Sequence, residues 1–162
     1  MEINLIAVLF AGLSIFLTGG IYYHPKVMGT AWMKASHLSM DDLKKEGMTK
    51  IFVSCFLLSL LIGLILNPIV IHQFGPLGMI GGPQFIEDAK PSYEAFMQDY
   101  GDAYRTFKHG ALHGFMTALF LILPILGINA IFERKTWKYI GIHSGYWLIA
   151  LSIAGGIIGG WQ

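Results

Sequence analysis

Four long apolar stretches dominate the pattern of hydrophobic and polar positions along the chain. None of them contains Asp, Glu, Lys or Arg, and each has roughly the 20 residues that a helix needs to cross a hydrocarbon core of about 30 Å. Their apolar residues are continuous and do not alternate with polar ones, and a helix satisfies its own backbone hydrogen bonds in lipid. The pattern therefore predicts four transmembrane helices, over residues 5–23, 51–71, 111–132 and 139–160.

The first stretch has the position of a signal peptide but lacks its features. No Lys or Arg precedes it, and no cleavage site of the small-x-small type follows it. We therefore expect a membrane helix at this position. The length of 162 residues fits one domain, so residues 1–162 are expected to form a single membrane domain.

The connections between the stretches differ in charge, and this difference predicts an orientation. Loop 24–50 and the hairpin 133–138 carry eight of the eleven basic residues, whereas loop 72–110 carries three. Basic residues favour the cytoplasmic side of a membrane. We therefore expect loop 24–50 to be the inner loop, loop 72–110 to be the outer loop, and both termini to lie on the outer, periplasmic side. The eight inner basic residues are Lys26, Lys34, Lys44, Lys45, Lys50, Arg134, Lys135 and Lys138.

Both loops carry signals of further local structure. In the inner loop, Ser39 followed three residues later by Asp42 resembles a helix N-terminal box, and a short interfacial helix with Trp32 toward lipid is expected before it. In the outer loop, residues 74–83 are apolar but interrupted by Gly and Pro. This interruption predicts turns in place of a helix.

Aromatic residues later in the outer loop fall on one stripe of a helix. The stripe consists of Tyr93, Phe96, Met97, Tyr100, Tyr104 and Phe107. Its spacing predicts an amphipathic helix from about Ser92 to Phe107 that lies on the outer membrane surface and leads into the third apolar stretch. A groove on a partner protein is the alternative for such a stripe.

Two blocks of sequence resemble a known family. The first block combines GIYYHP at residues 20–25 with MGTAWMK at residues 28–34, and the second combines NAIFE at 129–133 with Trp137-Lys138, Gly145-Tyr146 and GIIGGW at 156–161. Both are similar to the family catalogued as domain of unknown function 1761. The resemblance covers the chain except its outer loop, which is longer than usual, and it departs at His143, where Asn is expected. It implies four membrane spans in a bacterial protein and assigns no activity.

Composition supports a membrane protein and excludes other classes. Hydrophobic residues make up 54% of the chain and charged residues only 13%, whereas a soluble domain carries roughly a quarter charged residues. A net charge of +1 gives no electrostatic footprint for nucleic acid. The single cysteine, Cys55, excludes a disulfide framework and a thiolate-rich metal site. The expected fold is an all-α integral membrane protein, a four-transmembrane-helix bundle with an amphipathic interfacial helix in the outer loop.

Polar residues in or near the apolar stretches are the first candidates for a site. They are Asn67, Asn129, His143 and Tyr146. Because burying such groups unpaired costs roughly 2–7 kcal/mol, we expect them to face the bundle interior or another copy. There they join helices or, alternatively, line a polar path or ligand pocket. On the inner face Glu133 and Trp32 are candidates: a surface ion pair with Arg134 or Lys135 is the default for Glu133, and a contact with Trp32 or Lys34 is the alternative.

Histidines at the outer mouth of the third stretch are candidate metal ligands. His109 and His113 are one helical turn apart, a spacing that can place two imidazoles on one metal ion, and His72 could be a third ligand. Against a metal site, no Glu lies between the two, no cysteine is nearby and Lys108 adjoins them. We therefore expect no tightly bound metal, and we expect His109 and His113 to form hydrogen bonds with the segment 74–83.

Glycines at the end of the fourth stretch predict close helix packing. The pairs Gly155/Gly159 and Gly156/Gly160 are overlapping small-xxx-small motifs. A contact between copies is favoured slightly over packing within one chain.

These features favour a multi-pass protein of the bacterial inner membrane that self-associates and serves as a scaffold or accessory component. We expect a homo-oligomer, alone or in a larger membrane complex, with bound membrane lipid and no cofactor. The alternatives are a small-solute or ion pathway formed by the oligomer, and an enzyme or metal-binding protein that uses the outer histidines. The spans contain no carboxylate, which counts against a proton- or sodium-driven transporter, and no nucleophile elbow or phosphate loop is present.

Overall fold

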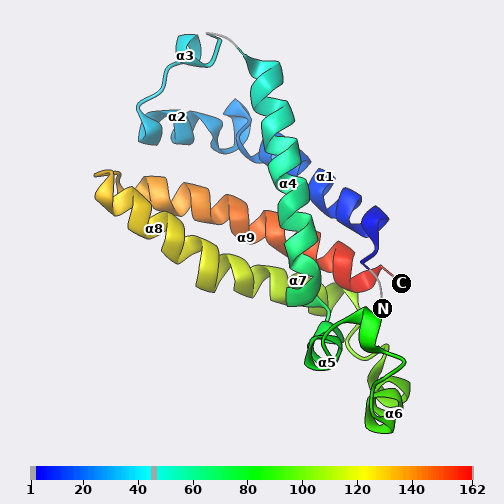
Figure 1. Cartoon of the computed structure of the whole chain (residues 1–162). Helices are drawn as coiled ribbons and strands as arrows, with labels where there is room; N and C mark the ends of the chain where they lie inside the picture. The colour runs from blue at the N-terminus through cyan, green and yellow to red at the C-terminus, as the bar shows by residue number, and fades with distance from the viewer. Residues whose placement is uncertain (1–2, 45–46, 162) are drawn as a thin grey trace.

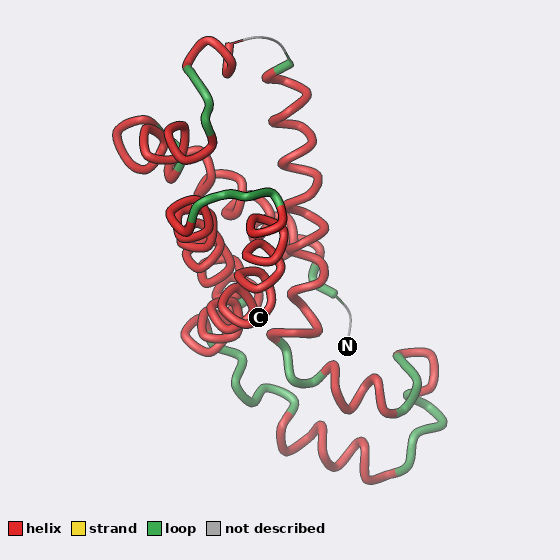
Figure 2. The backbone as a smooth tube through the Cα atoms, turned by 90° about the vertical axis from the view of Figure 1, so that its left-hand side faces the viewer, coloured by secondary structure: helices red, strands yellow, loops and turns green. Residues whose placement is uncertain are grey.

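The computed structural model describes residues 3–44 and 47–161, and within these residues it contains helices and connections but no strand (Figure 2). Among these described residues, four helical segments are long and apolar enough to cross a membrane. They are α1 (Leu5–Tyr22), α4 (Met48–Val70), the segment Phe107–Phe132 and α9 (Trp137–Gly160). Lys45, one of the basic residues of the expected inner loop, lies outside the described residues.

The chain runs back and forth between two ends of the molecule (Figure 1). One end, here the α2–α3 end, holds α2 (Thr30–Ser36), α3 (Met40–Lys44) and the turn that precedes α9. The other end, here the α5–α6 end, holds α5 (Phe74–Met79), α6 (Pro91–Tyr100) and both termini. The segments richest in basic residues therefore lie together at the α2–α3 end.

Helix α9 lies at the centre of the packing and contacts α1, α4, α7 (Phe107–Thr117) and α8 (Leu123–Phe132). Its most extensive contact is with α7, where small residues let the backbones meet. A Cβ added at Gly110 would collide with the carbonyl oxygen of Gly155, and one added at Gly114 would collide with that of Leu151. Because lipid tails are as apolar as the side chains, close packing of this kind holds membrane helices together.

The third membrane-length segment is interrupted in its middle. A π-helical turn, Ala118–Ile122, separates α7 from α8 directly before Pro124. Proline has no N–H to donate to the carbonyl four residues earlier, which here belongs to Phe120. The widened turn accommodates this missing hydrogen bond, as π-bulges do in other helices.

The inner-loop signals agree with the structure. Ser39 precedes α3, and its Oγ and backbone N–H both donate to the carboxylate of Asp42, while the Asp42 N–H donates to Ser39 Oγ at 3.2 Å. This reciprocal arrangement is the predicted N-terminal box. Trp32 lies on α2, a short helix at the expected position, and its ring packs against Tyr23.

Two expectations for the outer loop were wrong. Phe74–Met79 forms the short helix α5 where turns were predicted, because Pro76 occupies its first turn, where a missing N–H costs nothing. The aromatic helix α6 ends at Tyr100 and does not continue to Phe107. A new helix begins there because Thr106 Oγ accepts the His109 N–H at 3.2 Å as an N-cap.

Candidate functional site

Three histidines meet at the α5–α6 end. His109 and His113 project from successive turns of α7, and His72 follows the end of α4. The Nε2 atom of His109 lies 2.8 Å from Nε2 of His72 and 3.1 Å from Nε2 of His113. One ligand atom from each of the three residues lies within 4.8 Å of the other two. We call these residues the histidine cluster.

The histidine cluster is positioned by contacts that tie the outer loop to the helices. The buried side-chain amide of Gln73 donates to the carbonyl oxygens of Tyr100 at 2.8 Å and Ala103 at 2.9 Å. The guanidinium of Arg105 donates to the carbonyl oxygen of Trp161 at 2.8 Å. These bonds fasten the connection between α6 and α7 to the start of α5 and to the end of α9.

The ring of Tyr104 packs against the histidine cluster. Its ring centroid lies 4.9 Å from that of His109 and 5.6 Å from that of His72. Its backbone adopts the left-handed region with a φ of 63°. The sequence did not identify Gln73 as a positioning residue, although a polar residue next to a candidate metal ligand could have indicated that role. Tyr104 was expected on a continuous helix and lies instead between two helices.

The expected hydrogen bonds from His109 and His113 to residues 74–83 were wrong. The hydrogen bonds of their rings in the described part of the chain join His72, His109 and His113 to one another. The reason is the break between α6 and α7, because the new helix begins at Phe107 and carries the two rings toward the end of α4.

A second cluster lies at the α2–α3 end and joins α1 to α9. We call it the tyrosine cluster; it consists of Tyr22, Tyr23, Trp32, His143 and Tyr146. The Tyr22 hydroxyl donates to the Ile142 carbonyl at 3.0 Å, and the Tyr146 hydroxyl donates to the Ile15 carbonyl at 3.1 Å. The two family-like sequence blocks therefore meet in this cluster.

Tyr23 and His143 form the pair at the middle of the tyrosine cluster. The Tyr23 oxygen lies 2.9 Å from His143 Nδ1, and the Tyr23 ring packs against that of Trp32. Burial, reinforced by the neighbouring tyrosines, raises the pKa of Tyr23, so its hydroxyl stays protonated. The His143 Nε2 atom is buried and has no hydrogen-bond partner among the described residues.

Asn67 and Asn129 occupy opposite environments. Asn67 is 1% exposed, and its amide donates to the carbonyl oxygens of Gly63 at 3.0 Å and Leu64 at 3.2 Å. Pro68 cannot donate to Leu64, so the Asn67 side chain replaces the hydrogen bond that this proline removes. Asn129, by contrast, is exposed on α8.

Glu133 and Trp32 are not brought together by any polar contact. Trp32 packs against Tyr23, whereas Glu133 is exposed at the end of α8. Within the described ranges, no hydrogen bond or ion pair joins the Glu133 carboxylate to Trp32, to Lys34 or to its basic neighbours.

The glycines of α9 contact other parts of the same chain. Gly155 and Gly159 face Gly110 and Gly114 of α7, and Gly156 and Gly160 face Phe107. The contact between copies that was expected at these glycines is therefore replaced by packing inside the chain, because α7 already covers this face of α9.

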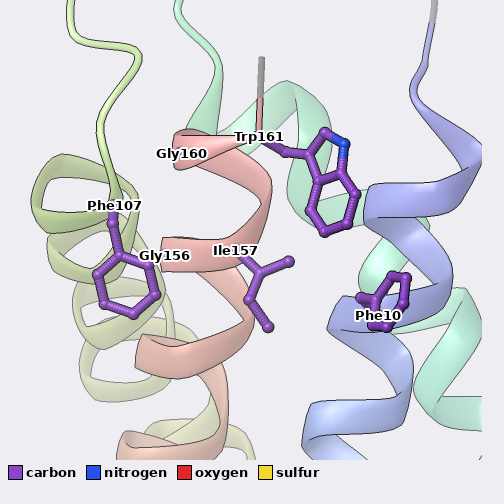
Figure 3. A pocket seen from close by; sticks show the side chains of 6 residues that line it. All are labelled: Phe10, Phe107, Gly156, Ile157, Gly160 and Trp161. Carbon is purple, nitrogen blue, oxygen red and sulfur yellow. The ribbon is translucent and has the colours of Figure 1, made fainter.

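An open apolar groove of about 530 Å³ lies beside these glycines (Figure 3). Its lining residues are Phe10, Phe107, Gly156, Ile157, Gly160 and Trp161. Figure 3 shows the Phe107 ring beside Gly156 on one side of Ile157, with Phe10 and Trp161 on the other. The rings of Phe10 and Trp161 stack at 5.3 Å between centroids and bring the start of α1 to the end of α9.

Comparison with known proteins supports the resemblance and adds no activity. Neither a curated protein nor a solved structure matches the chain. A family model matches residues 6–159, which is nearly the whole chain and includes the outer loop that the resemblance left out. The chain therefore belongs to the family described as protein of unknown function (DUF1761).

Proposed function

We propose that this chain is a self-associating, multi-pass component of the bacterial inner membrane that serves as a scaffold or accessory subunit of a larger membrane complex. The position of Asn129 carries the proposal. Asn129 shares one exposed face of α8 with Ile125, Ile128 and Phe132, at the spacing i, i+3, i+4 and i+7. A polar amide therefore lies in the middle of an outward-facing apolar surface.

An outward-facing amide is costly in lipid unless a partner covers it. Leaving such a group without a hydrogen bond in an apolar environment costs roughly 2–7 kcal/mol, and membrane helices use Asn side chains to bond to neighbouring helices. An Asn amide both donates and accepts. Two copies related by a two-fold axis can therefore pair Asn129 with Asn129, which makes a second copy of this chain the partner of this face.

The fraction of each membrane-length segment that is buried also supports this face of α8 as the contact between copies. Only 11% of the most apolar window of Phe107–Phe132 is buried inside the chain, against 44% for α9. The third segment therefore has the most surface left for lipid or another copy. Polar groups inside the chain, such as the Asn67 amide and the Tyr146 hydroxyl, bond to backbone carbonyls, which favours a structural role over a polar pathway.

The charge distribution and the groove complete the proposal. Eight of the eleven basic residues belong to loop 24–50 and the hairpin 133–138, which supports a cytoplasmic α2–α3 end and periplasmic termini. The groove between Phe107 and Trp161 is apolar and opens on the surface of membrane-length helices. These properties suit the acyl chain of a membrane lipid.

The association is tested by replacing Asn129 with Leu. We expect Asn129→Leu to weaken dimerisation in detergent by about 3- to 30-fold, since hydrogen bonds of this kind in membranes are worth about 0.6–2 kcal/mol. Sedimentation equilibrium over a range of protein-to-detergent ratios measures the change. Ile128→Leu on the same face is the matched control and should leave dimerisation unchanged. A monomeric wild-type protein, or equal dimerisation of wild type and Asn129→Leu, would contradict the proposal.

A further inference from the structure

We propose that His72, His109 and His113 bind a divalent transition-metal ion, and that zinc is the ion they suit best. The inference does not depend on self-association, because one chain supplies all three ligands. It differs from the expectation drawn from the sequence, which was that no metal is tightly bound. His72 can act as the third ligand only if it approaches the His109/His113 pair, and its Nε2 atom lies 2.8 Å from that of His109.

The spacing of the ring nitrogens matches a metal site. Zinc binds imidazole nitrogen at about 2.0–2.1 Å, and tetrahedral geometry then separates two such nitrogens by about 3.3 Å. The Nε2 separations of 2.8 Å and 3.1 Å lie just below this value, and all three ligand atoms lie within 4.8 Å of one another. Small side-chain rotations therefore suffice to centre an ion among the three rings.

The hydrogen-bonding capacity of the rings also favours an ion. A neutral imidazole nitrogen carries either one proton or one lone pair, so it serves as donor or acceptor and not as both. Nε2 of His109 faces Nε2 of both His72 and His113. As a donor it can direct its single proton well at one neighbour only, and as an acceptor it must share one lone pair between two. A metal ion accepts three lone pairs at once and satisfies all three nitrogens.

The donor set determines the class of metal. Imidazole suits zinc and its neighbours in the first transition series, whereas magnesium and calcium prefer oxygen ligands. The single cysteine, Cys55, lies in the first half of α4, away from His72 at the far end of that helix. Three histidine ligands leave a fourth tetrahedral position for water or another small ligand, as in open zinc sites.

The supports of the three ligands are rigid and the site is accessible. Thr106 caps the helix that carries His109 and His113, and Gly110 on the same helix lies against the backbone of α9. Gln73, the residue next to His72, is held in place by its two hydrogen bonds to Tyr100 and Ala103. His72 is exposed and the other two rings are half-buried, so an ion can enter from the surface of the α5–α6 end.

The test is a metal titration of protein that carries no His tag. After treatment with EDTA and removal of the chelator, the detergent-solubilised protein is titrated with zinc chloride by calorimetry, and with cobalt chloride by visible absorption. We expect one ion per chain and an intense tetrahedral cobalt spectrum. His72→Asn should weaken zinc binding by at least about 100-fold, since even the partners that orient zinc ligands are worth 10- to 100-fold.

His37→Asn is the matched control, because His37 is an exposed histidine at the opposite end, in a left-handed conformation that Asn tolerates. It should bind zinc as the wild type does. The wild-type cobalt spectrum requires no variant, so it tests the proposal even if a substitution disturbs folding. A wild-type protein without the tetrahedral spectrum, or with zinc affinity equal to that of folded His72→Asn, would overturn the proposal.

Discussion

The two ends of the molecule both gather histidine and tyrosine side chains, but they use them differently. In the tyrosine cluster, the Tyr22 and Tyr146 hydroxyls donate hydrogen bonds to backbone carbonyls, and the Tyr23 hydroxyl is hydrogen-bonded to His143. In the histidine cluster, three ring nitrogens converge, and Nε2 of His109 faces two neighbours although it can form a good hydrogen bond with only one of them. The first arrangement joins helices, whereas the second is suited to an added ion.

The clusters also differ in what holds them. The tyrosine cluster is built mainly on long helices, α1 and α9, with Trp32 of α2 packed against it. The histidine cluster combines α7 with a turn, and its geometry depends on Gln73 and Arg105, which tie the outer loop in place. We therefore expect changes at the tyrosine cluster to alter stability, and changes at the histidine cluster to alter metal binding.

The largest effect is expected from breaking the contact between α7 and α9. Gly114→Ala should lower stability by about 3 kcal/mol, the upper part of the usual range for overpacking, because the added Cβ meets the backbone oxygen of Leu151. It should also displace His109 and His113 while leaving the tyrosine cluster in place. Thermal unfolding in detergent and the cobalt spectrum measure the two effects.

Gly141→Ala is the control for this substitution, because a Cβ there meets nothing within 4 Å. It should preserve both stability and the cobalt spectrum. Equal thermal stability of Gly114→Ala and Gly141→Ala would show that α7 and α9 do not pack as closely as the structure has them.

A smaller effect, confined to the histidine cluster, is expected at Gln73. Gln73→Met keeps the side-chain volume but removes the two hydrogen bonds to Tyr100 and Ala103. Zinc affinity should fall by about 10- to 100-fold, the range found for residues that orient metal ligands. Gln98→Met, at an exposed position of α6, should leave the affinity unchanged. Unaltered zinc binding in Gln73→Met would mean that His72 is held without this residue.

At the tyrosine cluster, Tyr23→Phe should cost about 1–2 kcal/mol of stability, because it removes the hydrogen bond to a half-buried His143. Zinc affinity should not change, since the substitution lies at the opposite end. Tyr139→Phe retains the ring contact with His143 and removes a hydroxyl that makes no hydrogen bond in the described part of the chain. Thermal unfolding should therefore separate the two variants, and a loss of zinc binding in Tyr23→Phe would contradict the independence of the clusters.

The smallest effect on stability is expected from single cysteine substitutions, which report on which side of the membrane each end of the molecule lies. In a Cys55→Ser background, Lys90→Cys should react with an impermeant thiol reagent in intact cells, and Lys34→Cys should not. Both positions are exposed, so access across the membrane decides the result. Neither substitution should change thermal unfolding. The reverse labelling pattern would place the histidine cluster on the cytoplasmic side.

The four membrane-length helices could be predicted from the sequence because length, hydrophobicity and the lack of charge are local properties. The box of Ser39 and Asp42 was also predictable, since both partners lie within one turn. Local signals competed in the outer loop. The aromatic stripe favoured one long helix, but the Thr106 cap starts a new helix at Phe107.

The tertiary structure alone decided which residues meet. Apolar side chains surround every membrane-length helix, so the sequence contains little information on which face of each helix turns inward. This is why the outward position of Asn129 and the packing of Gly155 against α7 were not predictable. His72 is 37 residues from His109. The pair meets because α7 contacts α4 and because Gln73 and Arg105 tie the outer loop to the helices. The sequence by itself determined the four membrane-length helices, and packing between residues distant along the chain determined the sites.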